Sequence, residues 1–341
     1  MNSRKKIFVT GGGGFLGTSI CQQLIRSGYK VTSFSRKKYR HLVSIGVECY
    51  QGDLGNLNDL HEAMKSCDAV IHTAAKAGVW GCKNEFEKTN IEGTQNVIAA
   101  VKSNNIKKLI YTGSPSVAFS GQDIEGGDES LPYAKKFFCE YSRTKKIAEE
   151  EILSLHGSGN IKVLVLRPHL IWGPGDPHFL PRLLEKAKKG KLVRVGSLKN
   201  KVDVIYVENA ARAHVQALQS FEAGLLEGGK AYFLGQESPV NLWSFIDRLL
   251  LACGEKPLNK RLPFFLAYFL GLICEKVFSK RKIFHIDPPM TRFLAMQLAR
   301  SHYFSHKNAQ KDFSYNPQIS ISEGLIKLKE SMKRPREFKT L

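Results

Sequence analysis

The sequence predicts an α/β protein in which a doubly wound parallel sheet is followed by a smaller C-terminal lobe. Two observations lead to this fold class. Short apolar runs alternate with segments of helical length as far as Pro168, and a glycine-rich turn joins the first run to the first helical segment. Such alternation is typical of a parallel sheet with helices on both faces. Beyond Pro168 the alternation lapses, so we expect one domain over 1–172 and a smaller lobe over 173–341.

Six strands are expected, each a short apolar or β-branched run bounded by polar or turn-forming residues. They cover 6–10, 30–35, 47–51, 69–72, 108–112 and 163–167. Helical segments lie between them near 14–27, 56–65, 86–103 and 137–155. In the second lobe, the run 202–207 is strand-like, and we expect residues 202–214 to return the chain to the main sheet.

The glycine-rich turn predicts a dinucleotide-binding domain of the Rossmann type. Gly11, Gly14 and Gly17 follow the first strand and precede an amphipathic segment that stops at Gly28. Glycines at these places let the chain turn tightly, let a pyrophosphate approach the backbone, and let helix pack on strand. Free N–H groups at the start of the helix then face the phosphates. A glycine-rich hairpin without a ligand is the alternative, which the strand–turn–helix order disfavours.

The end of the second strand favours NADPH as the cofactor, with NADH as the alternative. A carboxylate there would bind the ribose diol of NAD, but the chain has Ser35 and Arg36, followed by further basic residues. A guanidinium can hold a 2′-phosphate through two hydrogen bonds. Asp53, after the third strand, could accept a hydrogen bond from the adenine amino group. Solvated surface loops are the alternative for both segments.

Tyr141 and Lys145 predict proton transfer coupled to hydride transfer. They are four residues apart on the fourth expected helix, so they share one face. Free tyrosine has a pKa of about 10, and a lysine one turn away stabilises the phenolate and can hold the nicotinamide ribose. A third group should orient the substrate oxygen. Ser114, just past the fifth strand, is favoured for this role over Ser116 and Thr112.

The positive charge of the chain is concentrated late. The 341 residues have a formal net charge of +20, and 256–341 contain 17 Lys or Arg but 6 Asp or Glu. No nucleic-acid recognition module accompanies this charge, so nucleic acid is not an expected partner. The apolar run 262–278 precedes the basic residues 280–282 and is shorter than the ~20 residues of a bilayer span. Residues 262–282 are expected either to lie on an anionic membrane surface or to cover a hydrophobic substrate pocket.

Seven scattered cysteines without a C-x-x-C spacing are typical of a reduced protein and predict neither a disulfide framework nor a metal site. The first strand begins close to the N-terminus with no signal peptide before it. A cytoplasmic location is therefore expected, with peripheral contact to the inner face of a membrane as a variant. The sequence leaves a homodimer open.

These motifs resemble those of the extended short-chain dehydrogenase/reductases over essentially the whole chain. The likeness rests on TGGGGFLG at 10–17, GDL at 52–54, HTAAKAGVWG at 72–81, NIEGTQNV at 90–97, YTGSPSV at 111–117, YSRTK at 141–145, LRPHLIWGPGDP at 166–177 and VDVIYVENAARAH at 202–214. The chain is most similar to the 3β-hydroxysteroid dehydrogenase/sterol dehydrogenase branch, and especially to bacterial 2-alkyl-3-oxoalkanoate reductases. Gly113 departs from the pattern, because many members have serine or threonine there.

The resemblance implies a cofactor site and a catalytic group. The implied cofactor contacts are Gly11, Gly14, Phe15, Leu16, Arg36, Asp53, Leu54, Ala74, Ala75, Asn90, Tyr141, Lys145 and Pro168. Among them, Ala74 and Ala75 would line the cofactor channel. Asn90 would lie with Thr94 beside the nicotinamide half, and Pro168 would cover the nicotinamide. Ser114, Tyr141 and Lys145 would be the catalytic residues.

The implied function is an NAD(P)H-dependent oxidoreductase with Tyr141 as proton donor or acceptor. It would interconvert a ketone and a secondary alcohol on a hydrophobic substrate, either a 2-alkyl-3-oxoalkanoate or a 3-oxo or 3β-hydroxysteroid-like molecule. A nucleotide-sugar epimerase or dehydratase on the same fold is the alternative, although that chemistry usually combines NAD with a polar lobe. A dinucleotide-sensing protein without catalysis is disfavoured because Ser114, Tyr141 and Lys145 are all present.

Overall fold

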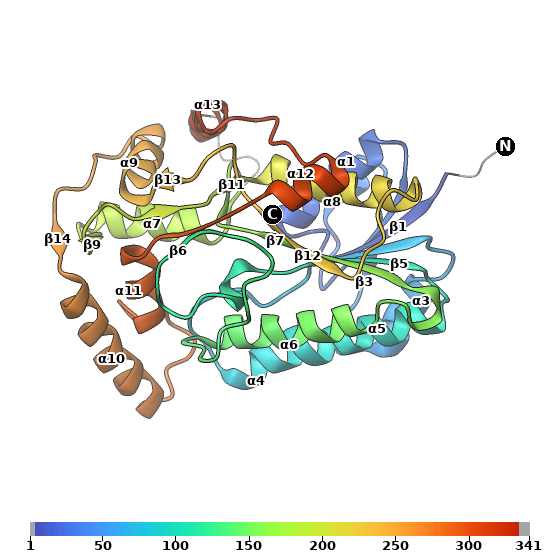
Figure 1. Ribbon diagram of the computed structural model, residues 1–341, viewed down its shortest axis with the longest axis horizontal. Helices are drawn as coiled ribbons and strands as arrows, with labels where there is room; N and C mark the ends of the chain where they lie inside the picture. Colours follow the sequence, from blue (N-terminus) through green and yellow to red (C-terminus); the bar gives the residue numbers. More distant parts are fainter. Residues whose placement is uncertain (1–3, 334–341) are drawn as a thin grey trace.

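The computed structural model describes residues 4–333. At its centre is a sheet of seven parallel strands (Figure 1). The strand order is β3-β2-β1-β4-β5-β7-β12. Their bounds are β1 Lys6–Thr10, β2 Lys30–Ser35, β3 Glu48–Gln51, β4 Ala69–His72, β5 Lys108–Thr112, β7 Lys162–Pro168 and β12 Lys230–Leu234. The strand order reverses at β1, which has β2 on one side and β4 on the other. Ligands of such sheets bind at this reversal, beyond the carboxyl ends of the strands.

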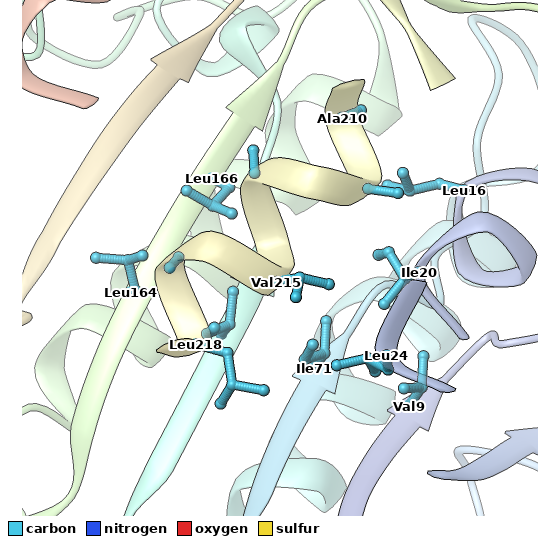
Figure 2. Packing of buried hydrophobic residues seen from close by; sticks show 14 of the residues in the cluster. Val9, Leu16, Ile20, Leu24, Ile71, Leu164, Leu166, Ala210, Val215 and Leu218 are labelled. Carbon is cyan, nitrogen blue, oxygen red and sulfur yellow. The ribbon is translucent and has the colours of Figure 1, made fainter. Parts of the chain in front are cut away.

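Helices cover both faces of the sheet. On one face lie α1 (Phe15–Arg26), α8 (Val207–Glu222) and α12 (Lys307–Phe313), and on the other lie α3 (Leu57–Ala63), α5 (Gly93–Ser103) and α6 (Glu140–Ser154). The two layers follow from the alternation of side chains along each strand, since Val9 packs in the first layer and Phe8 in the second. Figure 2 shows the first layer, where α1 and α8 meet over the strands.

All six expected strands are confirmed. The prediction that residues 202–214 add a strand to the main sheet is wrong, because the seventh strand comes from another segment. Residues Lys201–Val202 form β10 and Ile205–Tyr206 form β11, and neither belongs to the main sheet. The place beside β7 is taken by β12, which pairs with it in parallel from Lys230 to Leu234. The segment does return to the sheet, but as helix α8, which packs against α1 rather than pairing with a strand.

The expected helix 86–103 is divided in three. It consists of α4 (Lys83–Phe86), a π-helical segment (Glu87–Glu92) and α5. A π-helical turn inserts an extra residue into the helical ladder and often occurs at functional sites. The expected helices 14–27, 56–65 and 137–155 correspond to α1, α3 and α6.

The second lobe packs around its own core of aromatic and aliphatic residues, which includes the buried side chains of Trp172 and Trp243. Its helices are α7 (Phe179–Lys188), α9 (Leu242–Ala252), α10 (Phe264–Lys280), α11 (Arg292–Ala299) and α13 (Ile321–Lys333). A small sheet of order β13-β10-β15-β6 includes β13 (Val240–Asn241), β15 (His302–Phe304) and β6 (Ile124–Gly127). Since α8, β12 and α12 return to the main sheet, the chain crosses between the two parts several times.

The remaining elements are short. They are helix α2 (Arg40–Val43), two 3-10 helices (Pro115–Val117 and Ser158–Asn160) and strands β8 (Ile171–Trp172), β9 (Arg194–Val195) and β14 (Arg261–Leu262). Between residues 4 and 333, no helix is both long enough and apolar enough to cross a membrane.

Candidate active site

The glycine turn lies where β1 passes into α1, at the reversal of strand order. Gly11 has a φ of +67°, and a Cβ there would lie 2.9 Å from the Cα of Ala74. A Cβ on Gly17 would lie 2.1 Å from the carbonyl oxygen of Gly11. Gly14 is the N-cap of α1, so the N–H groups of Phe15 and Leu16 lack acceptors within the helix. This cradle has the features that a pyrophosphate needs: a backbone without side chains and a helix N-terminus.

A cavity of about 710 Å³ lies at the carboxyl ends of β2 and β3, where the adenosine half of the cofactor is expected. Its lining residues are Arg36, Lys38, Cys49, Tyr50, Gln51, Gly52 and Asp53. Arg36 and Asp53 thus share one cavity, because β2 and β3 are neighbours and both segments lie at their carboxyl ends. Arg36 and Lys38 are exposed and belong to no ion pair among the described residues. Two such cations lining one cavity favour an anionic group there.

Four further predicted cofactor contacts, Leu54, Ala74, Ala75 and Pro168, have different surroundings. The Leu54 side chain packs against Gly93, where a Cβ would come within 2.9 Å of it, and the Leu54 carbonyl accepts a hydrogen bond from Asn96 at 2.8 Å. Ala74 lies directly against the glycine turn, whereas Ala75 is exposed. Pro168 is buried at the end of β7 and pairs with Leu234. Their roles as cofactor contacts stay predictions.

A chain of hydrogen bonds runs under the crevice from β1 to α5. Thr10 Oγ1 accepts from the N–H groups of Thr73 and Ala74, so its own proton goes to His72 Nδ1 at 2.6 Å. Thr94 Oγ1 donates to the Asn90 carbonyl at 2.7 Å, so it accepts from His72 Nε2 at 3.0 Å. His72 is therefore neutral with its proton on Nε2. Burial, reinforced by the nearby charge of Lys145, lowers the His72 pKa to about 3.

Asn90 lies in the π-helical segment and joins three parts of the site. Its Oδ1 accepts from the Lys76 N–H at 2.7 Å, and its Nδ2 donates to the Lys76 carbonyl at 3.1 Å and to Thr144 Oγ1 at 3.0 Å. Both amide protons are thus used within the protein. Asn90 therefore ties the loop after β4 to α6, and its role as a cofactor contact stays a prediction.

The three predicted catalytic residues meet at the carboxyl end of β5. Tyr141 is the second residue of α6, close to the positive end of the helix dipole. Burial raises the pKa of Tyr141 above its usual value, and a hydrogen bond with the Ser114 hydroxyl acts in the opposite direction. Ser114 Oγ also lies 2.9 Å from Ser116 Oγ. The favoured serine and the favoured tyrosine are therefore brought together.

Lys145 is fully buried one turn further along α6. Its Nζ donates to the Thr112 carbonyl at 2.5 Å and lies 4.0 Å from the centre of the Tyr111 ring. Burial lowers the pKa of Lys145 to about 7, although the Glu149 carboxylate acts in the opposite direction. Keeping the Lys145 ammonium charged in this buried place costs free energy. A bound anion or polarised hydroxyl beside it would stabilise the charged form.

Beside the catalytic residues lies a cluster of apolar side chains, here called the aromatic cluster. Its buried members are Phe119, Phe293 and Met296, packed with Val79, Ile124, Phe138, Cys139, Phe264 and Tyr268. Phe138 and Cys139 come directly before the helix of Tyr141, and Phe119 follows the loop of Ser114. Helices α10 and α11 of the second lobe thus bring apolar groups to the catalytic end of α6.

Sequence reasoning missed several residues of the site. Tyr39 covers the glycine turn so closely that a Cβ on Gly13 would lie 1.9 Å from its ring. Lys38 lines the same cavity as Arg36, and only its place in a basic run could have suggested this. The partners of His72 could not have been found without knowing which strands are neighbours.

The fold and the site together define an oxidoreductase that exchanges a hydride with a nicotinamide dinucleotide. A family model described as "3-beta hydroxysteroid dehydrogenase/isomerase family" matches residues 8–264. The chain belongs to this family.

Relatives extend the match over almost the whole chain. A "2-alkyl-3-oxoalkanoate reductase" of Shewanella oneidensis is 45% identical over 335 residues, which cover 95% of this chain and 86% of the relative. One of the same name from Stenotrophomonas maltophilia is 42% identical, with coverage of 96% and 99%. A mouse "Sterol-4-alpha-carboxylate 3-dehydrogenase, decarboxylating" is 32% identical, with coverage of 99% and 94%.

Solved structures show the same fold at lower identity. The UDP-glucose 4-epimerase of Thermus thermophilus in complex with NAD has a TM-score of 0.74 and 22% identity, and the match covers 96% of this chain and 99% of that one. At this identity the likeness concerns the fold alone.

Proposed function

We propose that this protein is an NADPH-dependent reductase of 2-alkyl-3-oxoalkanoates or closely similar hydrophobic β-keto acids. The observation that carries the proposal is the meeting of Ser114, Tyr141 and Lys145 beside the aromatic cluster. Two relatives named 2-alkyl-3-oxoalkanoate reductase, 45% and 42% identical, support the substrate class.

The chemistry follows from the positions of these groups. A bound nicotinamide dinucleotide supplies the hydride. Tyr141 gives its proton to the ketone oxygen, and the Ser114 hydroxyl, which lies beside Tyr141, donates a hydrogen bond to the same oxygen. Lys145 and the N-terminus of α6 stabilise the phenolate that remains. The reverse transfers oxidise the alcohol.

The cofactor preference rests on the cavity at the adenosine end. Arg36 and Lys38 both line it, and the only carboxylate among its lining residues, Asp53, accepts a hydrogen bond from the Gly55 N–H at 2.8 Å. A 2′-phosphate would therefore meet two cations, whereas the ribose diol of NADH would leave them unpaired.

A cofactor-consumption screen tests the proposal. Purified protein would be incubated with NADPH or NADH and with three substrate classes: 2-alkyl-3-oxoalkanoates, 3-oxosteroids and UDP-sugars. We expect NADPH to be oxidised with the β-keto acids. Turnover of 3-oxosteroids alone would move the substrate to the sterol type. Conversion of a UDP-sugar with no net cofactor consumption would instead establish the epimerase alternative.

A further inference from the structure

Helix α10 presents an unusual amount of apolar surface to solvent. Six of its apolar side chains, here called the α10 face, are exposed by between 41% and 67%: Phe265, Leu266, Phe269, Leu270, Ile273 and Val277. Their spacing of three, four and eight residues places them on one side of the helix. A contiguous apolar face of this kind is rare on a protein that contacts only water.

The opposite side of α10 is firmly attached to the protein. Ala267 and Gly271 are buried, and a Cβ on Gly271 would lie 2.6 Å from the backbone of Thr291 and Arg292. Glu275 accepts hydrogen bonds from both the backbone N–H and the Nε of Arg292, at 2.7 and 2.6 Å. The helix is therefore held with its α10 face outward.

Basic residues lie at both ends of this face. The exposed ones are Lys260 and Arg261 before the helix, and Lys276, Lys280, Arg281 and Lys282 in its last turns and just beyond. None of these six has an ion-pair partner among the residues that the structure describes. The nearby acids are already paired, Glu275 with Arg292 and Asp287 with Arg182. An apolar face flanked by free cations complements a surface of apolar chains and anionic headgroups.

The inner side of the same helix leads to the catalytic centre. Phe264 and Tyr268 belong to the aromatic cluster beside Tyr141. Trp80, in the loop that follows β4, donates to the Ile283 carbonyl at 2.9 Å and stacks on Phe284 with ring centres 5.8 Å apart. One side of α10 and the segment after it thus contact the active-site loops, while the other side is open.

The geometry points to a peripheral membrane-binding surface: α10 lies along an anionic bilayer, with its α10 face in the headgroup region and its basic ends on the lipid phosphates. The helix has 17 residues, so it can lie along the surface but does not cross the bilayer. The active site is then directly behind the lipid-facing wall, where a water-insoluble substrate is available.

Sedimentation with lipid vesicles tests this surface, with the full-length protein and no substrate, so that the result does not depend on the proposed reaction. Vesicles of phosphatidylglycerol and phosphatidylcholine should carry the wild-type protein into the pellet at low salt. Phosphatidylcholine alone or high salt should release most of it, because the attraction of fixed charges is screened. Wild-type protein that stays in the supernatant with phosphatidylglycerol at low salt would overturn the proposal.

Two variants and a matched control locate the contact. Changing Lys280, Arg281 and Lys282 to Gln should weaken partitioning by about tenfold or more. Changing Leu266 and Phe269 to Ser should weaken binding further at every salt concentration. The control changes Lys307, Lys311 and Lys329 to Gln, which removes the same charge from α12 and α13, on another side of the molecule (Figure 1). An equal loss in the control would overturn the assignment to α10.

A second copy of the chain is the other occupant that could cover the α10 face. Sedimentation equilibrium of the wild type and of the Leu266→Ser/Phe269→Ser variant distinguishes it. A wild-type dimer that the double variant dissociates would overturn the membrane assignment. An unchanged association state, together with lost vesicle binding and unchanged NADPH affinity, would support it.

Discussion

The carboxylate of Glu149 occupies the space that a side chain at Gly113 would need. A Cβ added to Gly113 would lie 2.8 Å from Glu149 Oε2 and 2.7 Å from Val165 Cγ1. Glu149 is held in this place by a buried ion pair with Arg167 and by a hydrogen bond from the Tyr133 hydroxyl at 3.0 Å. Glycine at position 113, which has no side chain, therefore leaves room for this buried ion pair under the catalytic loop.

Gly113→Ala should lower the free energy of unfolding by about 1–3 kcal/mol, the usual cost of overpacking a core. Urea denaturation of the wild type and the variant measures this. Val165→Ala removes the nearest of these contacts, so the double variant should lose less stability than the sum of the single variants. Strict additivity would show that the Val165 contact is not the cause.

Tyr141→Phe should lower kcat by several orders of magnitude, because the proton-transfer group is lost while the helix and its cradle remain. NADPH affinity, measured by fluorescence titration, should change little. Tyr303→Phe is a suitable control, because the Tyr303 hydroxyl makes no hydrogen bond among those the structure describes. Retention of more than about a tenth of wild-type activity in Tyr141→Phe would remove this residue from the mechanism.

Arg36→Ala should raise the KM for NADPH by about tenfold or more, since a charged hydrogen bond contributes about 1.5–3 kcal/mol. Lys38→Ala should have a smaller effect in the same direction, because an ammonium makes one contact where a guanidinium makes two. The KM for NADH should be almost unchanged in both variants. Equal changes for the two cofactors would mean that neither residue binds the 2′-phosphate.

Acid should destabilise the protein through His72. Its folded-state pKa of about 3 lies below the usual 6.5, so between these values the unfolded chain binds a proton that the folded chain does not. Stability is then lost as the pH falls from about 6.5 towards 3, with a slope of up to about 1.4 kcal/mol per pH unit from this group. His72→Gln should show a flatter acid limb in urea denaturation at several pH values. The exposed His285→Gln should keep the wild-type slope, and a wild-type slope in His72→Gln would contradict the assignment.

The parts of the site that can be predicted from the sequence are those formed by residues close together in the chain. Gly11 and Gly14 follow a recognisable strand, and Tyr141 and Lys145 lie on one helix whatever that helix packs against. Arg36 and Asp53 could be assigned to one ligand because consecutive strands of this fold type lie side by side.

The remaining features depend on contacts between distant residues. The fit of Gly113 against Glu149, the neutral state of His72 and the use of Asn90 by Lys76 and Thr144 are all set by packing that no local pattern contains. Strand β12 was missed for the same reason. A run of four apolar residues is ambiguous until the open edge of β7 is known. By the same local criteria, the run 202–207 is equally suitable for that edge.

Strand β12 is synthesised long after its neighbour β7, and this order affects how the protein folds during translation. Domains usually fold as they leave the ribosome, beginning at the N-terminus. Here β7 is complete at Pro168, but its outer neighbour ends only at Leu234. During the synthesis of the intervening residues, the nascent sheet has an unpaired edge of backbone N–H and C=O groups, which is the kind of edge that captures other chains. Protein yield should therefore be sensitive to slow codons and to chaperone supply within this interval.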